Sequence, residues 1–116
     1  MTSVFLLNYR SAPSVLAQPT VDIRRWQIVK TTLGEMLLVG VLSNRFTWRV
    51  TTAIVAFCAT THWVTTQSGR KYELVGPPAL DALDLMVIDA RLAMNRISRV
   101  ENVSDSYTQA MAGATQ

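Results

Sequence analysis

The chain has 116 residues, 49% of them hydrophobic, so it can bury the core of one domain and is too short for two. Its only cysteine, Cys58, excludes an intramolecular disulfide and is typical of a protein of the reducing cytoplasm. The net charge of +3 is uneven, because residues 1–71 carry a net charge of +6 and residues 72–116 a net charge of −3. A basic first half fits an acidic partner or nucleic acid, and scattered solubilising charge explains it equally well.

Residues 1–21, with Pro13 and Pro19, are predicted to form a flexible arm or an edge strand ahead of a single domain over residues 22–116. The apolar run Val4–Leu7 is too short for a signal peptide and lacks a basic flank, so we expect no secretion. The longest uncharged run, residues 50–66, is shorter than the ~18 residues of a membrane span and is rich in threonine, so we expect strands and no membrane association.

Alternating or continuous apolar runs predict strands over residues 25–31, 36–42, 46–57, 61–66 and 71–75. The turn Gln67–Arg70 joins the last two strands. Gly69 suits a hairpin with a bulge there, because glycine takes a positive φ without steric cost. Pro77 and Pro78 end the sheet, because each proline removes a donor from the hydrogen-bond ladder.

A helix of four to five turns is predicted to start near Leu80, and a short C-terminal helix starts at the N-cap Ser104. One face of the first helix is the predicted core face, and its apolar residues are Leu83, Met86, Val87, Ala90, Ala93, Met94 and Ile97. The opposite face carries a second stripe, Leu85, Ile88 and Leu92. Either the segment Val4–Leu7 or the C-terminal segment covers this stripe, or it is an interface with a second copy or a foreign protein.

These elements predict an α+β fold: a five-stranded, strongly bent antiparallel sheet or small SH3-like barrel, followed by a packing helix and a short C-terminal helix.

The residues give no support for catalysis. Cys58 and His62 are four residues apart across a turn, and a small cysteine beside an incidental histidine explains them. The carboxylates after the sheet, Glu73, Asp81, Asp84 and Asp89, are typical of a solvated helix face. Zinc-ligand spacing, P-loop and dinucleotide-binding glycines are all missing from the sequence, so we expect no catalytic residue, metal or cofactor.

Basic residues that alternate with aromatic residues suggest a nucleic-acid surface. The cationic candidates are Arg45, Arg49, Arg70 and Lys71, and Trp26, Trp48, Trp63 and Tyr72 lie in or beside the same strands. Such pairs can stack bases and hold phosphates, although tryptophans in a domain of this size are more often core. The turn Ser68–Lys71 can present backbone N–H groups and two cations to a phosphate, or it is only a hairpin turn.

The tract from Thr65 to Pro77 resembles a T-x-SGR-x-Y-x-L-x-G-P pattern of small, uncharacterised proteins from proteobacterial genomes, phages and mobile elements. Trp26, Gly40 and the run Thr51–Ile54 are also similar to that pattern. The resemblance implies an accessory protein that binds a host or defence complex without catalysis, as anti-CRISPR proteins do.

Two functions follow as expectations. The first is a non-enzymatic, cytoplasmic protein-binding module that occupies a partner, such as a host defence complex, through the stripe Leu85/Ile88/Leu92 or a basic strand face, or that forms a homodimer. The second is a small nucleic-acid-binding barrel that uses Arg45, Arg49, Arg70 and Lys71.

Overall fold

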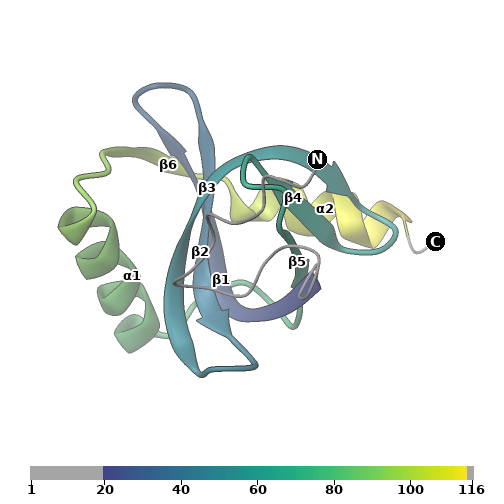
Figure 1. Ribbon diagram of the computed structural model, residues 1–116, viewed down its shortest axis with the longest axis horizontal. Helices are drawn as coiled ribbons and strands as arrows, with labels where there is room; N and C mark the ends of the chain where they lie inside the picture. Colours follow the sequence, from purple (N-terminus) through teal and green to yellow (C-terminus); the bar gives the residue numbers. More distant parts are fainter. Residues whose placement is uncertain (1–19, 115–116) are drawn as a thin grey trace, which may run out of the picture.

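The computed structural model describes residues 20–114 (Figure 1). Six strands and two helices follow one another along this part of the chain. The strands are β1 (Thr20–Thr31), β2 (Met36–Leu42), β3 (Thr47–Cys58), β4 (Trp63–Thr66), β5 (Lys71–Leu74) and β6 (Arg99–Asn102). Helix α1 (Ala82–Met94) lies between β5 and β6 in sequence, and α2 (Ser104–Ala114) follows β6.

Strands β1 to β5 close into a small barrel, because each strand pairs with the next and β5 pairs with β1. The pairings from β1 through β5 along the chain are antiparallel, whereas β1 and β5 are parallel, with Val21 opposite Tyr72. Strand β6 adds to the far end of β1, with Lys30 opposite Glu101. Strand β1 therefore has three partners: β2 along most of its length, β5 at its start and β6 near its end.

The barrel interior holds the first of two hydrophobic clusters. It contains Ile23 and Trp26 of β1, Leu38 of β2, Val64 of β4 and Tyr72 of β5, all buried. Alternate residues of each strand point to the same face, which is why these side chains meet inside the barrel. The indole N–H of Trp26 donates to the carbonyl of Gly76 over 3.1 Å, so the buried ring has no unpaired polar group.

A bulge interrupts β1 between Arg24 and Gln27, where the register with β2 shifts. Gly40 of β2 faces the bulge, and a Cβ there would lie 2.7 Å from Cγ1 of Ile23 and 2.9 Å from the carbonyl oxygen of Arg24. Glycine lets the two strands approach this closely, so Gly40 makes the bulge possible.

Helix α1 covers the outer surface of the barrel, on the left in Figure 1, and forms the second cluster with it. Its residues Ile88 and Leu92 pack against Val29 of β1 and against Leu37 and Val39 of β2. Strand β2 is therefore apolar on both faces, as its continuous apolar run predicts.

Helix α2 packs on the barrel away from α1 and contributes Met111 to the first cluster. Its first residue, Ser104, accepts the backbone N–H of Ile28 over 2.9 Å and donates to Oδ1 of Asn102 over 2.6 Å. Tyr107 packs edge-to-face on Phe57, with ring centroids 4.8 Å apart, and burial raises the pKa of its phenol.

The predicted α+β class, small barrel, packing helix and C-terminal helix are confirmed. The prediction missed β6 and the parallel pairing of β1 with β5. Strand β1 begins at Thr20, so Thr20 and Val21 belong to the sheet and not to the arm, while residues 1–19 lie outside the described residues. In the described range 20–114, no helix has the length and apolar character needed to cross a membrane.

Candidate functional site

The two faces of α1 are the reverse of the prediction. Ile88 is 0% and Leu92 3% exposed against the sheet, and Leu85 is half-buried beside them. The predicted partner-binding stripe Leu85/Ile88/Leu92 is thus core of the described domain and needs no cover from another segment. A helical wheel places both apolar stripes of this helix correctly, but it contains no information on which stripe turns to the sheet.

A side-chain cap and two ion pairs accompany the packing of α1. At the N-terminal end the Asp81 side chain caps the helix by accepting the backbone N–H of Leu83 over 2.7 Å, and Asp84 lies 3.7 Å from the guanidinium of Arg25. At the other end Asp89 pairs with Arg99 of β6 over 2.8 Å. These contacts agree with the burial of Ile88 and Leu92 against the barrel.

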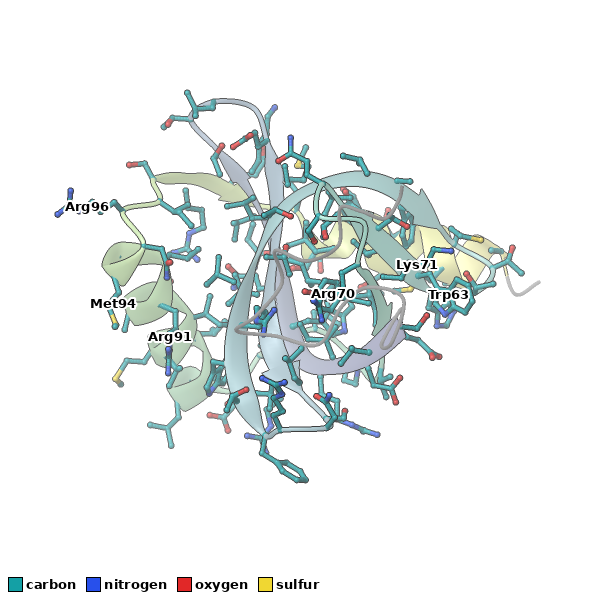
Figure 2. The ribbon with its side chains drawn as sticks, in the orientation of Figure 1. Trp63, Arg70, Lys71, Arg91, Met94 and Arg96 are labelled. Atoms are coloured by element: carbon teal, nitrogen blue, oxygen red, sulfur yellow. The ribbon has the colours of Figure 1, made fainter. Side chains whose placement is uncertain are left out.

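The outer face of α1, defined by Leu83, Met86, Ala90 and Met94, points away from the barrel. Leu83 is 68%, Met86 63% and Met94 73% exposed. Figure 2 shows Met94 and Arg96 on the side of the helix remote from the sheet. Three large apolar side chains on one helix face, uncovered by the described residues, mark a candidate protein-binding surface.

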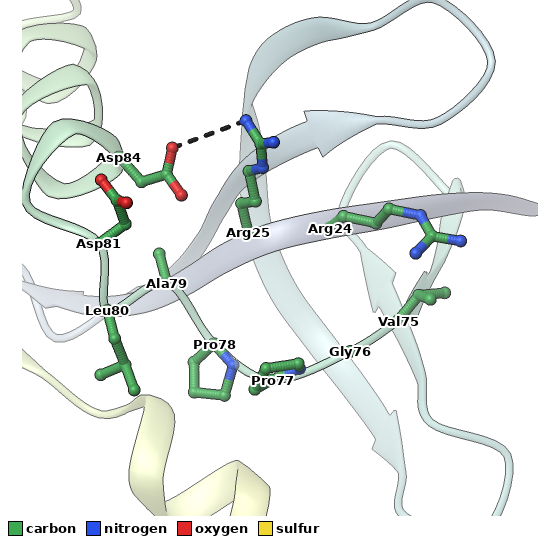
Figure 3. A pocket seen from close by; sticks show the side chains of 10 residues that line it. All are labelled: Arg24, Arg25, Val75, Gly76, Pro77, Pro78, Ala79, Leu80, Asp81 and Asp84. Carbon is green, nitrogen blue, oxygen red and sulfur yellow. Dashed lines mark ion pairs between the residues drawn. The ribbon is translucent and has the colours of Figure 1, made fainter.

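A second candidate surface surrounds the β1 bulge. Arg24 and Arg25 leave β1 in different directions, with Arg25 directed toward Asp84 of α1 (Figure 3). Arg25 has a φ of 51°, in the left-handed region that non-glycine residues seldom adopt. The bulge therefore aims two neighbouring cations to different sides of one strand.

Two clefts flank this pair of arginines. One, of about 430 Å³, is bounded by the linker Val75–Leu80 and by Asp81 and Asp84 (Figure 3). The linker follows β1 past the bulge, because Val75 donates its N–H to Ile23 and Ala79 donates its N–H to Trp26. The other cleft, of about 290 Å³, opens toward the turn between β2 and β3, and Val41, Ser43, Phe46 and Trp48 line it with the two arginines.

The predicted cations do not form one cluster. Arg45 lies in the β2–β3 turn, Arg49 pairs with Gly40 in the sheet, and Arg70 and Lys71 lie at the β4–β5 turn. Lys71 stacks over Trp63 at 5.2 Å from the ring centroid (Figure 2). Of the predicted aromatic residues, Trp26 and Tyr72 are core, whereas Trp48 and Trp63 are half-buried.

The β4–β5 turn is a hairpin turn that uses its own donors. The N–H groups of Gln67, Ser68 and Gly69 are donated to the carbonyl of Ala53, the hydroxyl of Thr52 and the carbonyl of Thr66. Gly69 has the positive φ of 88° that the hairpin prediction requires. These N–H groups already have acceptors, which favours the hairpin reading of this turn over the alternative of a phosphate nest.

Arg24 and Phe46 were missed as candidates. The pair Arg24-Arg25 is visible in the sequence, but nothing in it signals a bulge. Phe46 lies 85% exposed at the hairpin tip with a φ of 55°, where the sequence predicted the start of a strand.

Cys58 is exposed, and hydrogen bonds from Thr61 lower the pKa of its thiol from the usual 9.0. Within residues 20–114, no three His, Cys, Asp or Glu residues gather as a metal site would require. Of the two clefts, the one beside the β2–β3 turn combines cations with aromatic rings, and the other combines cations with the carboxylates of Asp81 and Asp84.

The chain matches no protein-family model, and neither a curated protein nor a solved structure matches it. The outer face of α1 and the surface around the β1 bulge are the features of the described residues that bear on function.

Proposed function

We propose that the protein is a non-enzymatic protein-binding module and that the outer face of α1 is its docking surface. The observation that carries this proposal is the exposure of Leu83, Met86 and Met94 on one face of a helix whose opposite face is fully used by the core. Burying these side chains against a partner would remove apolar surface from water at about 25 cal/mol per Å².

The spacing of this face fits a helix as partner. Leu83, Met86, Ala90 and Met94 follow one another at steps of three, four and four residues, close to the three-and-four spacing of a helix–helix seam. The acidic N-cap Asp81 lies at the N-terminal end of the helix, and Arg91 lies in its last turn. A helix with the same order of charges, running antiparallel, brings opposite charges together and also opposes the two helix dipoles.

A second copy of this chain supplies such a helix, with the same seam spacing and the same order of charges. Two copies related by a twofold axis would present the same outer face to each other, with the acidic end of each helix beside the basic end of the other. Because a 13-residue helix offers less area than a standard interface, we expect a weak dimer that dissociates on dilution.

Sedimentation velocity over a range of protein concentrations tests this form of the proposal. We expect the wild-type chain to move from monomer to dimer and the double variant Leu83→Glu/Met86→Glu to stay monomeric. Leu33→Glu is the matched control, because Leu33 is 81% exposed at the β1–β2 turn, away from α1. A wild-type monomer at every concentration, or a dimer that survives the double variant, contradicts self-association through this face.

The likeness of the tract Thr65–Pro77 to phage and mobile-element proteins supports a biological setting for the proposal. In that setting the protein acts in the cytoplasm as an accessory factor that blocks a host defence complex, as anti-CRISPR proteins do. The measurement is target cleavage by a purified CRISPR surveillance complex with and without this protein. Undiminished cleavage at saturating protein contradicts the role against that complex.

A further inference from the structure

The cleft beside the β2–β3 turn has an ordered floor. Arg24 of β1 pairs with Val41 of β2, and Val41 pairs with Trp48 of β3, so the three side chains form one row across the sheet. Directly paired residues of neighbouring strands project to the same face. The row therefore places a guanidinium, an aliphatic side chain and an indole side by side at the bottom of a 290 Å³ cleft.

Phe46 forms the outer wall of this cleft and has no packing role that explains its position. The ring is 85% exposed, although its backbone is held at a φ of 55° by the N–H of Phe46, which donates to the carbonyl of Leu42 over 2.7 Å. Arg25, the other wall, is also at positive φ. Strained non-glycine residues concentrate at functional sites, and two of them line this one cleft.

The charge of the cleft is positive. Of the six described residues that line it, two are arginines and none is acidic, and Arg45 stands next to Phe46 in the turn. Arg24 donates its Nε to the hydroxyl of Ser43 over 3.3 Å, and among the described residues its two terminal nitrogens have no acceptor. A planar pair of donors of this kind suits a phosphate or a carboxylate.

From these features we propose that the cleft binds single-stranded nucleic acid, with a base stacked on Phe46 beside Trp48 and the adjoining phosphates held by Arg24 and Arg45. Stacking on an exposed aromatic ring requires an unpaired base, which excludes a duplex as the ligand. The flat rings and the absence of a hydrogen-bonding pocket for a base edge among the lining residues predict tolerance of base sequence. An acidic peptide would use the arginines and leave the rings without a role.

Fluorescence anisotropy of labelled oligo(dT) and oligo(U), with a matching duplex and polyglutamate as competitors, tests the proposal. We expect saturable binding of the single strands that weakens steeply between about 50 and 200 mM salt. We also expect quenching of Trp48 fluorescence, identified by its loss in Trp48→Phe. Absence of saturable binding at the lower salt overturns the proposal, as does equal competition by the duplex or by polyglutamate.

Variants separate stacking from charge. Phe46→Gly keeps the positive φ and removes the ring, so it should weaken binding by about 5–100-fold with an unchanged salt slope. Arg24→Gln should lower the salt slope by about 0.7, the value for one phosphate of a single strand. Lys71→Gln, at the β4–β5 turn, is the matched control and should leave the slope unchanged. An equal effect of Lys71→Gln and Arg24→Gln, or no effect of Phe46→Gly, overturns the assignment to this cleft.

This site is independent of the outer face of α1. The double variant Leu83→Glu/Met86→Glu should bind oligo(dT) as the wild type does, and Phe46→Gly should leave the sedimentation behaviour unchanged. Failure of one proposal is therefore distinguishable from failure of the other.

Discussion

Phe46 is the residue at which stability and binding are expected to conflict. A left-handed backbone costs a residue with a Cβ roughly 1–2 kcal/mol, and an aromatic ring that is 85% exposed returns little packing energy. The turn between β2 and β3 therefore holds a side chain that the fold does not need.

Phe46→Gly should raise the free energy of unfolding by about 0.5–1 kcal/mol, because glycine takes the positive φ without the steric cost and loses part of that gain in chain entropy. Urea denaturation followed by far-UV circular dichroism measures the change. Phe46→Ala is the control, since alanine retains the Cβ and should bring no gain. A stability loss in Phe46→Gly would show that the ring supports the fold.

At this scale the sequence predicted the types of residue better than their arrangement. It singled out arginines near aromatic residues, and Trp48 does line the proposed cleft, with Arg45 next to Phe46 in the adjoining turn. It missed Arg24 because the cleft that Arg24 lines depends on the bulge in β1. That bulge in turn depends on how closely the backbone of β1 approaches Gly40 of β2. The positive φ of Phe46 likewise follows from the hydrogen bond to Leu42 and not from any side-chain preference.

At the scale of the element, α1 shows that for a helix with two apolar faces the sequence can predict the wrong face as the buried one. Large aliphatic residues, Ile88 and Leu92, fill the space above Val29 and Val39 of the sheet. The opposite face mixes long, flexible methionines with alanine, and it remains outside. The burial of Ile88 and Leu92 therefore decides between the faces, and the exposed ion pairs of Asp84 and Asp89 with residues of β1 and β6 add little.

Paired alanine substitutions test the orientation of α1. Ile88→Ala should lower the free energy of unfolding by about 2–5 kcal/mol, because it leaves a cavity under a fully buried side chain. Met86→Ala, two residues away on the outer face, should change it by no more than about 0.5 kcal/mol. Chemical denaturation of the two variants gives both values, and the reverse order would restore the orientation that the wheel predicted.

On the scale of the whole molecule, Arg99 connects three elements. From β6 it donates to Oε1 of the buried Gln27 in β1 over 2.8 Å and pairs with Asp89 of α1 at 2.8 Å. The two contacts link the added strand, the outer helix and the barrel. The sequence offered no sign of this link, because β6 is too short for a periodic pattern.

Arg99→Leu should lower the free energy of unfolding by about 1–3 kcal/mol, since the carbonyl oxygen of the buried Gln27 amide loses its partner. The matched control is Arg91→Leu, which removes an exposed arginine of α1 and should cost a few tenths of a kcal/mol through the helix dipole. Thermal and urea denaturation of both variants measure the difference. Equal losses would mean that the effect comes from charge alone.

The pairing of β1 with strands far along the chain has a consequence for biosynthesis. Residues Thr20–Ile23 find their partners in Lys71–Leu74, and Val29 finds its partner in Asn102. A ribosome adds about 5–20 residues per second, so several seconds pass between the synthesis of β1 and the synthesis of its last partner strand, β6. During that interval the nascent chain exposes the unpaired edge of a strand rich in apolar residues, the kind of edge that is prone to pair with other chains.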